Sequence, residues 1–356
     1  MSVPQIRIVP LSDWPPLDQQ AWANAVHRAD VLDKPGPLAH LSEEQLAKKQ
    51  SAYGRWLGFV AEGNSTCRNL SSMDAITPTN VRAFINKLQS LFAPYTVAGY
   101  VTDLAVVVHS FWRDGDFGFL RIAATNLRRQ GRPANDKRSR LRPSSEIYQL
   151  GFDLMHEAER CADAFGAAVI FRDGLMIALL AARPVRLANL ASIEIDRHLS
   201  RHGSDYWLTF PAREMKTRRH LEFPLPKKLS LVMELYLTKY RPILTAGSGR
   251  WTRGKHSGLW VSAHGSKLSA DRIYQRIVDR TRERFGRSIN PHLFRDAAAT
   301  SIAIEDPGHV GIVTTILGHS TTKTAATYYN QANSLEATRR HQAVVQHLRT
   351  QSVGKA

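Results

Sequence analysis

Apolar residues recur at helical spacing through most of residues 41–117, in three segments. The first begins at Ser42, a good N-cap followed by acidic residues, and the second has Thr79 as a candidate N-cap. The third, residues 95–112, places apolar side chains at Val97, Tyr100, Val101, Leu104, Val107 and Val108. The pattern predicts a helical domain over residues 41–126, preceded by an N-terminal arm, residues 1–40, with a short helix near residues 19–29.

The pattern becomes mixed after Ser144. Helical segments lead to three short runs typical of strands, at residues 193–199, 205–210 and 220–226. Residues 227–240 are amphipathic again, and a further short strand and helix precede residue 290. The sequence therefore predicts a mainly α fold with a small antiparallel β-sheet, with a second domain at residues 144–333 and a C-terminal helical tail at residues 334–356.

The most apolar run of the chain, residues 164–182, is interrupted by Arg172 and Asp173. Such an interruption favours a buried core helix over a membrane span. The N-terminus lacks the apolar core of a signal peptide, and Cys67 and Cys161 lack metal-site spacing. We therefore expect a cytoplasmic protein with reduced cysteines and no membrane partner.

Basic residues outnumber acidic ones, 48 to 31, which gives a formal charge of +17. A polyanionic partner is expected, although basicity alone does not separate nucleic acid from an acidic membrane surface. The predicted linker, residues 127–143, is especially basic, with Asp136 as its one acid. It is either a solvated connection or a segment that lies along a phosphate backbone. Its candidate DNA-binding residues are Arg128, Arg129, Arg132, Lys137, Arg138, Arg140 and Arg142.

Candidate chemistry is concentrated in residues 290–330. Asn290 is a good N-cap and Pro291 suits the first helical position, so His292 and Arg295 should share one face of a first helical turn. Helix-terminal N–H groups favour an anion at this place, and phosphate fits it. Tyr328 adds a hydroxyl with an ordinary pKa of about 10. It becomes a nucleophile toward phosphorus when nearby cations stabilise the phenolate.

The order His-x-x-Arg, Leu-Gly-His-Ser around His319, then tyrosine resembles the C-terminal half of the tyrosine recombinase, or phage integrase, family. The family also needs an upstream arginine and a lysine. Arg186 matches that arginine, whereas Arg183 does not. Asn189 stands where the family more often has an acid, and its amide can still accept a hydrogen bond that orients the arginine.

In the resembling family, a lysine in a β-hairpin protonates the leaving 5′ oxygen. Lys216 matches that place, and Arg218 and Arg219 are poorer candidates because a guanidinium gives up its proton reluctantly. The nine-residue spacing from His319 selects Tyr328 as the nucleophile over Tyr329. Asp296 departs from the family pattern, which commonly has a basic residue there, and it either lies outside the phosphate pocket or pairs with an arginine.

Each of these residues also has an ordinary structural interpretation. His292 and Arg295 could cap a helix, and His319 could be a satisfied core histidine. A metal-dependent nuclease is disfavoured because no His-Glu-x-x-His or clustered carboxylate motif is present, and His198 and His202 fall in predicted strand and turn. The agreement of five elements in the family's order therefore favours the recombinase interpretation.

The resemblance implies a helical core-binding domain and a mixed α/β catalytic domain that form a C-shaped clamp on DNA. It implies cleavage through a 3′-phosphotyrosyl intermediate, strand exchange through a Holliday junction, and no metal or ATP cofactor. The implied partners are double-stranded DNA with specific recombination sites and, in some members, accessory DNA-bending or directionality factors. The enzyme would be a homo-tetramer on DNA and a monomer or dimer otherwise.

The implied role is integration, excision or rearrangement of a mobile element in the bacterial cytoplasm, with the protein on the nucleoid when bound. The tail helix either docks on a neighbouring protomer or folds back on its own domain. Two alternatives remain: a type IB topoisomerase that only relaxes DNA, and a catalytically silent DNA-binding relative.

Overall fold

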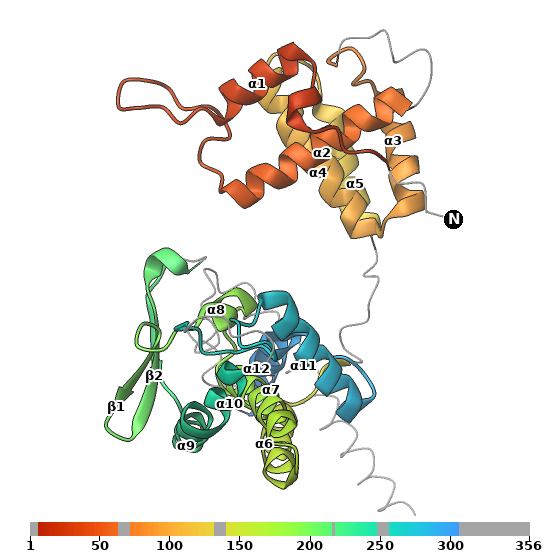
Figure 1. Cartoon of the computed structure of the whole chain (residues 1–356). Helices are drawn as coiled ribbons and strands as arrows, with labels where there is room; N and C mark the ends of the chain where they lie inside the picture. The colour runs from red at the N-terminus through yellow and green to blue at the C-terminus, as the bar shows by residue number, and fades with distance from the viewer. Residues whose placement is uncertain (1–5, 63–71, 132–139, 216–217, 248–255, 306–356) are drawn as a thin grey trace, which may run out of the picture. The chain divides into compact units, whose positions relative to one another are not determined.

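The computed structural model describes residues 6–62, 72–131, 140–215, 218–247 and 256–305 (Figure 1). The chain divides into two compact units, Met1–Asp136 and Lys137–Ala356. The fold is mainly helical with one small antiparallel sheet, as the sequence predicts.

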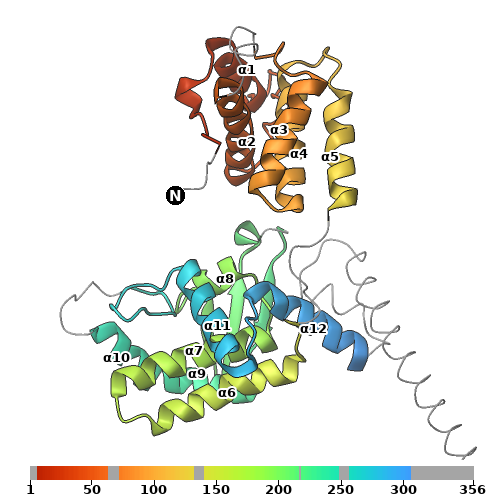
Figure 2. The ribbon, with the colours of Figure 1, turned by 90° about the vertical axis from the view of Figure 1, so that its right-hand side faces the viewer.

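Five helices and a short 3-10 turn, η1 (Leu11–Asp13), make up the described part of the first unit. The helices are α1 (Pro16–Val26), α2 (Glu43–Glu62), α3 (Pro78–Leu91), α4 (Pro94–Phe111) and α5 (Gly118–Gln130) (Figure 2). Their core is rich in aromatic residues, with Tyr53, Trp56 and Phe84 almost fully buried. The apolar positions predicted for α4 line this core, because Val97, Val101 and Leu104 are inaccessible to solvent.

The N-terminal segment is part of this core and not a separate arm. Trp14, Trp22 and Leu38 are buried in the same cluster as α2 and α4. The Trp14 ring lies 4.8 Å from that of Tyr53, and the Tyr53 hydroxyl donates a hydrogen bond of 2.9 Å to Asp18. The two tryptophans bury large apolar surfaces, which explains why residues 6–38 pack against the bundle.

The helix ends show which local predictions hold. Ser42 and Gln45 form a capping box at α2, which confirms the Ser42 cap. At α3 the cap is Thr77 and not Thr79, because Pro78 takes the first helical position. Helix α5 continues to Gln130, so the predicted linker residues Arg128 and Arg129 lie in its last turn.

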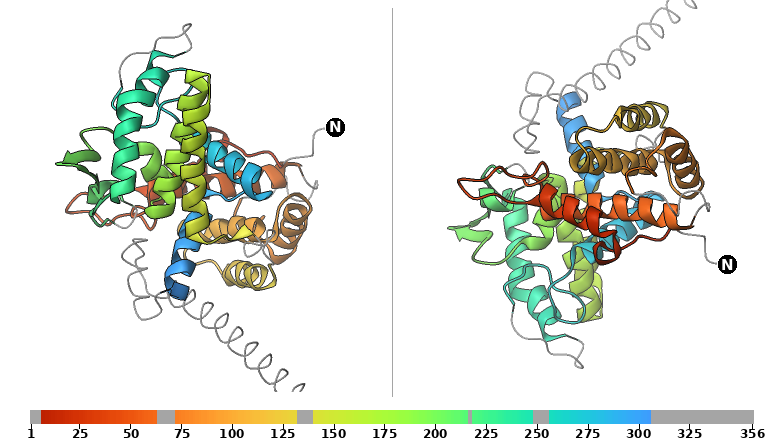
Figure 3. Two further views of the ribbon diagram at one scale, coloured as in Figure 1. Left: turned by 90° about the horizontal axis from the view of Figure 1, so that it is seen from below. Right: turned by 90° about the horizontal axis from the view of Figure 1, so that it is seen from above.

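The second unit is built around α7 (Ala164–Ala182), which packs along α6 (Ser144–Arg160). Gly151 and Gly174 permit this close approach, since a Cβ on Gly151 would lie 2.7 Å from the Gly174 carbonyl oxygen. Around α7 lie α9 (Lys227–Leu235), the π-helical turn η4 (Tyr236–Tyr240), α10 (Arg241–Ala246), α11 (Ala270–Phe285) and α12 (Pro291–Glu305) (Figure 3). The short α8 (Leu187–Ser192) contacts α11.

Helix α7 is long and apolar enough to cross a membrane, the one such helix in the described ranges. However, 72% of its most apolar stretch is buried inside the unit. Its two charged residues are buried as well, and Arg172 donates a hydrogen bond of 2.7 Å to Asp173. Arg276 and Arg280 from α11 also bond to Asp173. These contacts are those of a core helix, as the sequence predicts.

The sheet consists of β1 (Leu199–His202), β2 (Asp205–Phe210) and β3 (Leu221–Pro224), antiparallel and in sequence order. In β2 the alternate residues Tyr206, Leu208 and Phe210 are buried. Phe210 pairs with Leu221, so residues 211–220 form the β2–β3 connection. The connection begins with a 3-10 turn, η3 (Ala212–Glu214).

Candidate active site

The start of α12 has the predicted capping geometry. The Leu293 N–H donates a hydrogen bond of 3.1 Å to the Asn290 side-chain oxygen, and Pro291 is the first helical residue. The His292 side chain is exposed, whereas Arg295 is 7% exposed. Both residues therefore lie at a helix N-terminus whose free N–H groups favour an anion.

Arg186 is brought to the same place from more than a hundred residues earlier in the chain. It is the N-cap residue of α8, and Val185 and Leu190 on either side are buried. The Arg295 guanidinium donates a hydrogen bond to the carbonyl oxygen of Pro184, two residues before Arg186. This bond ties the start of α12 to the segment that leads into α8.

A cavity of about 450 Å³ lies between these elements. It is lined by Arg186, Leu187, Tyr274, Asn290, Pro291, His292 and Arg295. Two guanidinium groups and one imidazole thus meet beside a helix N-terminus. Guanidinium groups bind phosphate oxygens in bidentate fashion, so the cavity suits a phosphate group.

Tyr274 in this cavity was not anticipated from the sequence. It follows Ile273 on α11, where Ile273 and Ile277 are buried and Tyr274 is 40% exposed. Helical periodicity places it beside the buried stripe of α11. Only the packing of α11 against α8 and α12 brings it to the cavity, and this packing leaves no local signal in the sequence.

The structure describes only some of the other predicted site residues. Lys216, His319 and Tyr328 lie outside the described residues, as do Arg132, Lys137 and Arg138. Arg140 is half-buried, and Arg142 lies over the Phe285 ring, 5.7 Å from its centre. Asp296 is buried, and it is not among the described residues that line the cavity.

Asn189 is buried on α8, and its side-chain nitrogen lies 3.3 Å from the Met215 sulfur. From the sequence we expect the oxygen of this amide to accept a hydrogen bond that orients Arg186. The contact with Met215 is made by the amide nitrogen, which reaches the β2–β3 connection. His198 lies in the turn before β1 and His202 ends β1. Within the described ranges no group of three or more His, Cys, Asp or Glu side chains is placed to hold a metal ion.

A sequence model of the phage integrase family matches residues 153–335, which is half of the chain. The chain belongs to the phage integrase, or tyrosine recombinase, family. The match covers α7 to α12 and the sheet, and it extends past Tyr328. A search of curated protein sequences finds no match.

Solved structures of recombinases resemble this chain at low sequence identity. The XerH site-specific recombinase bound to difH substrate, in a pre-cleavage complex, is 14% identical with a TM-score of 0.56, covering 91% of this chain and 95% of that chain. The XerA recombinase is 16% identical with a TM-score of 0.40, covering 85% of this chain and 93% of that one. The first likeness supports the recombinase fold.

Proposed function

We propose that this chain is a site-specific tyrosine recombinase that cleaves and rejoins double-stranded DNA for integration, excision or rearrangement of a mobile element. The observation that carries the proposal is the convergence of Arg186, His292 and Arg295 on one cavity at the start of α12. Arg186 comes from a segment more than a hundred residues before the one that holds His292 and Arg295, and each of the three matches a position of the family's motif.

In the proposed reaction, Tyr328 attacks the scissile phosphorus and forms a 3′-phosphotyrosyl bond while the bond to the 5′ oxygen breaks. Arg186 and Arg295 bind the non-bridging oxygens, His319 donates a further hydrogen bond, and His292 accepts the tyrosine proton or a hydrogen bond. Lys216 gives its proton to the leaving 5′ oxygen. Because the phosphotyrosine keeps the bond energy, a 5′ hydroxyl from another duplex can reverse the step.

The charge of +17 supports DNA as the partner. We further propose that the two units hold DNA as a clamp, that protomers form a tetramer on paired sites, and that exchange passes through a Holliday junction in the cytoplasm. Arg128 and Arg129 at the end of α5 are candidate phosphate contacts, together with the basic residues that follow. A topoisomerase would relax plasmid without exchanging strands, and a silent relative would bind without a covalent link.

The proposal predicts covalent attachment of the protein to DNA without metal. Supercoiled plasmid carrying the DNA that flanks the gene is incubated with the full chain in EDTA and stopped with SDS. We expect protein-linked DNA, and mapping its ends locates the cleavage site. Binding without any adduct, on all flanking DNA, would contradict catalysis and favour the silent relative.

Arg295 offers a second test, because its guanidinium can bond both to phosphate and to the Pro184 carbonyl. A lysine supplies a point charge and not a planar fork. We expect Arg295→Lys to slow single-turnover cleavage by about 10²- to 10³-fold, the usual effect of losing one transition-state donor.

The matched control for this arginine is Arg201→Lys on β1, where the exposed Arg201 pairs with Glu234 at 3.0 Å. Its cleavage rate should stay close to wild type. Equal rates for the two variants would show that the Arg295 guanidinium has no special role in the reaction.

A further inference from the structure

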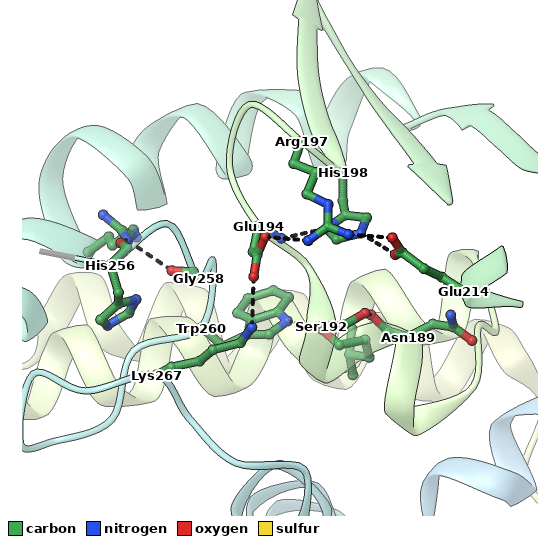
Figure 4. Close-up of polar contacts among 12 residues, drawn as sticks. Asn189, Ser192, Glu194, Arg197, His198, Glu214, His256, Gly258, Trp260 and Lys267 are labelled. Carbon is green, nitrogen blue, oxygen red and sulfur yellow. Dashed lines mark hydrogen bonds and ion pairs between the residues drawn. The ribbon is translucent and has the colours of Figure 1, made fainter. Parts of the chain in front are cut away.

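A buried histidine joins the two segments on which the proposed chemistry depends. His198 lies in the turn between α8 and β1 and is 1% exposed. Its Nδ1 accepts a hydrogen bond of 3.1 Å from the Glu194 backbone N–H, so its proton is on Nε2. That nitrogen donates to Glu214 at 2.7 Å (Figure 4). The geometry therefore sets both the tautomer and the partner of this ring.

Glu214 ends η3, at the start of the β2–β3 connection. Besides the bond from His198 it accepts one from Arg197, which also bonds to Glu194 at 3.1 Å. The hydrogen bond from His198, followed by that from Arg197, lowers the pKa of the Glu214 carboxyl. The carboxylate is thus held in its charged form between two donors that come from one turn (Figure 4).

The next residue of the connection is anchored to the same part of the fold. Met215 is buried and its sulfur contacts the Asn189 amide on α8. Helix α8 is itself anchored to the core, because the buried Trp260 indole donates a hydrogen bond of 2.8 Å to the Leu190 carbonyl. Asn189 follows Arg186 by three residues. One short segment, residues 186–198, therefore contains the arginine proposed to bind phosphate and also the residues that bond to Glu214 and contact Met215.

We propose that His198 and Glu214 are positioning residues for proton transfer to the leaving 5′ oxygen. This inference rests on the proposed function, in which Lys216, the residue after Met215 in the chain, is the general acid. A misplacement of about 1 Å can lower a rate by about 100-fold. Two directional hydrogen bonds to one carboxylate limit such movement more tightly than apolar packing does, because they fix angles as well as distances.

The test uses the cleavage site mapped with the covalent adduct, in two duplexes. One has the natural oxygen at the 5′ bridging position of the scissile phosphate, and the other has sulfur there. A thiol ionises near pH 8.5, whereas an alcohol ionises far above neutral pH. The sulfur can leave as a thiolate without a proton, so the second duplex needs no general acid.

We expect His198→Leu and Glu214→Ala to cleave the oxygen duplex about 10- to 100-fold more slowly than wild type, because the acid is displaced. On the sulfur duplex they should cleave at nearly the wild-type rate. His198→Gln keeps a donor near Nε2 and should recover part of the rate on oxygen. His202→Gln is the matched control, since His202 is an exposed histidine of β1 whose ring contacts Ser200, and it should behave as wild type on both duplexes.

If His198→Leu and Glu214→Ala lose cleavage rate equally on both duplexes, the inference is overturned, because equal losses would show a general structural defect. Lys216→Ala separates the inference from the proposed function. If the sulfur duplex restores the cleavage rate of Lys216→Ala but not that of His198→Leu or Glu214→Ala, Lys216 is the general acid and the positioning role is wrong. If sulfur does not restore Lys216→Ala, the general acid is wrongly assigned, and the positioning role is overturned with it.

Discussion

Replacing Tyr328 by phenylalanine is expected to abolish covalent attachment of the protein to DNA, while binding to the same DNA persists. The substitution removes one oxygen, the atom that would bond to phosphorus. The choice of Tyr328 over its neighbour depends on its nine-residue spacing from His319. On a helix, the adjacent Tyr329 would point about 100° away.

Two matched phenylalanine variants sharpen this test. Tyr329→Phe examines the neighbouring residue, and Tyr274→Phe examines the tyrosine that the structure places in the cavity. Both are expected to form the adduct, measured as protein-linked DNA after SDS. Loss of the adduct in Tyr329→Phe alone would move the nucleophile by one residue. Loss in Tyr274→Phe alone would place it on α11 and overturn the assignment made by resemblance.

Asp173→Asn is expected to destabilise the second unit by about 3–5 kcal/mol, the usual result of breaking a buried ion pair. Asp173 is 1% exposed and accepts bonds from three arginines, of which Arg172 is as deeply buried. Asparagine keeps an acceptor oxygen but removes the charge, so the Arg172 guanidinium would stay in the core without a counter-ion. The side chains of Arg276 and Arg280 are 33% and 14% exposed to solvent, whereas that of Arg172 is 3% exposed.

The measurement is thermal or denaturant unfolding of the full chain, followed by a signal of the second unit. For a domain of this size the melting temperature should fall on the order of 10 °C. The control is Asp153→Asn, which breaks the exposed pair between Asp153 and Arg284, 3.4 Å apart, and should change stability by less than about 1 kcal/mol. Similar small effects in both variants would show that the charge of Asp173 is dispensable.

Local signals in the sequence were sufficient where the structure depends on neighbouring residues. Asn290 and Pro291 start α12 as predicted, since a cap and a fixed backbone angle act within a few residues. At α3 the same signals favour Thr77, which precedes the proline directly, and the prediction of Thr79 as the cap is wrong. Such an error moves a helix boundary and leaves the fold unchanged.

The parts that sequence reasoning missed depend on distant partners. Arg172 and Asp173 mark α7 as a core helix, but nothing near them indicates that arginines of α11 complete the cluster. In the same way, Tyr274 and the contact of Asn189 with Met215 arise from tertiary packing. The candidates Arg186, His292 and Arg295 could be named from order and spacing, because the family's pattern already encodes which distant residues meet, and all three line one cavity.

The bond between Arg295 and the Pro184 carbonyl has a thermodynamic consequence for ligand binding. A free arginine side chain loses about 2 kcal/mol of rotamer entropy when it is immobilised. Here the guanidinium is already held by the backbone before any phosphate arrives. Under the proposed function, that entropy is lost during folding and not during association, so the binding of a phosphate would need little further ordering of this cation.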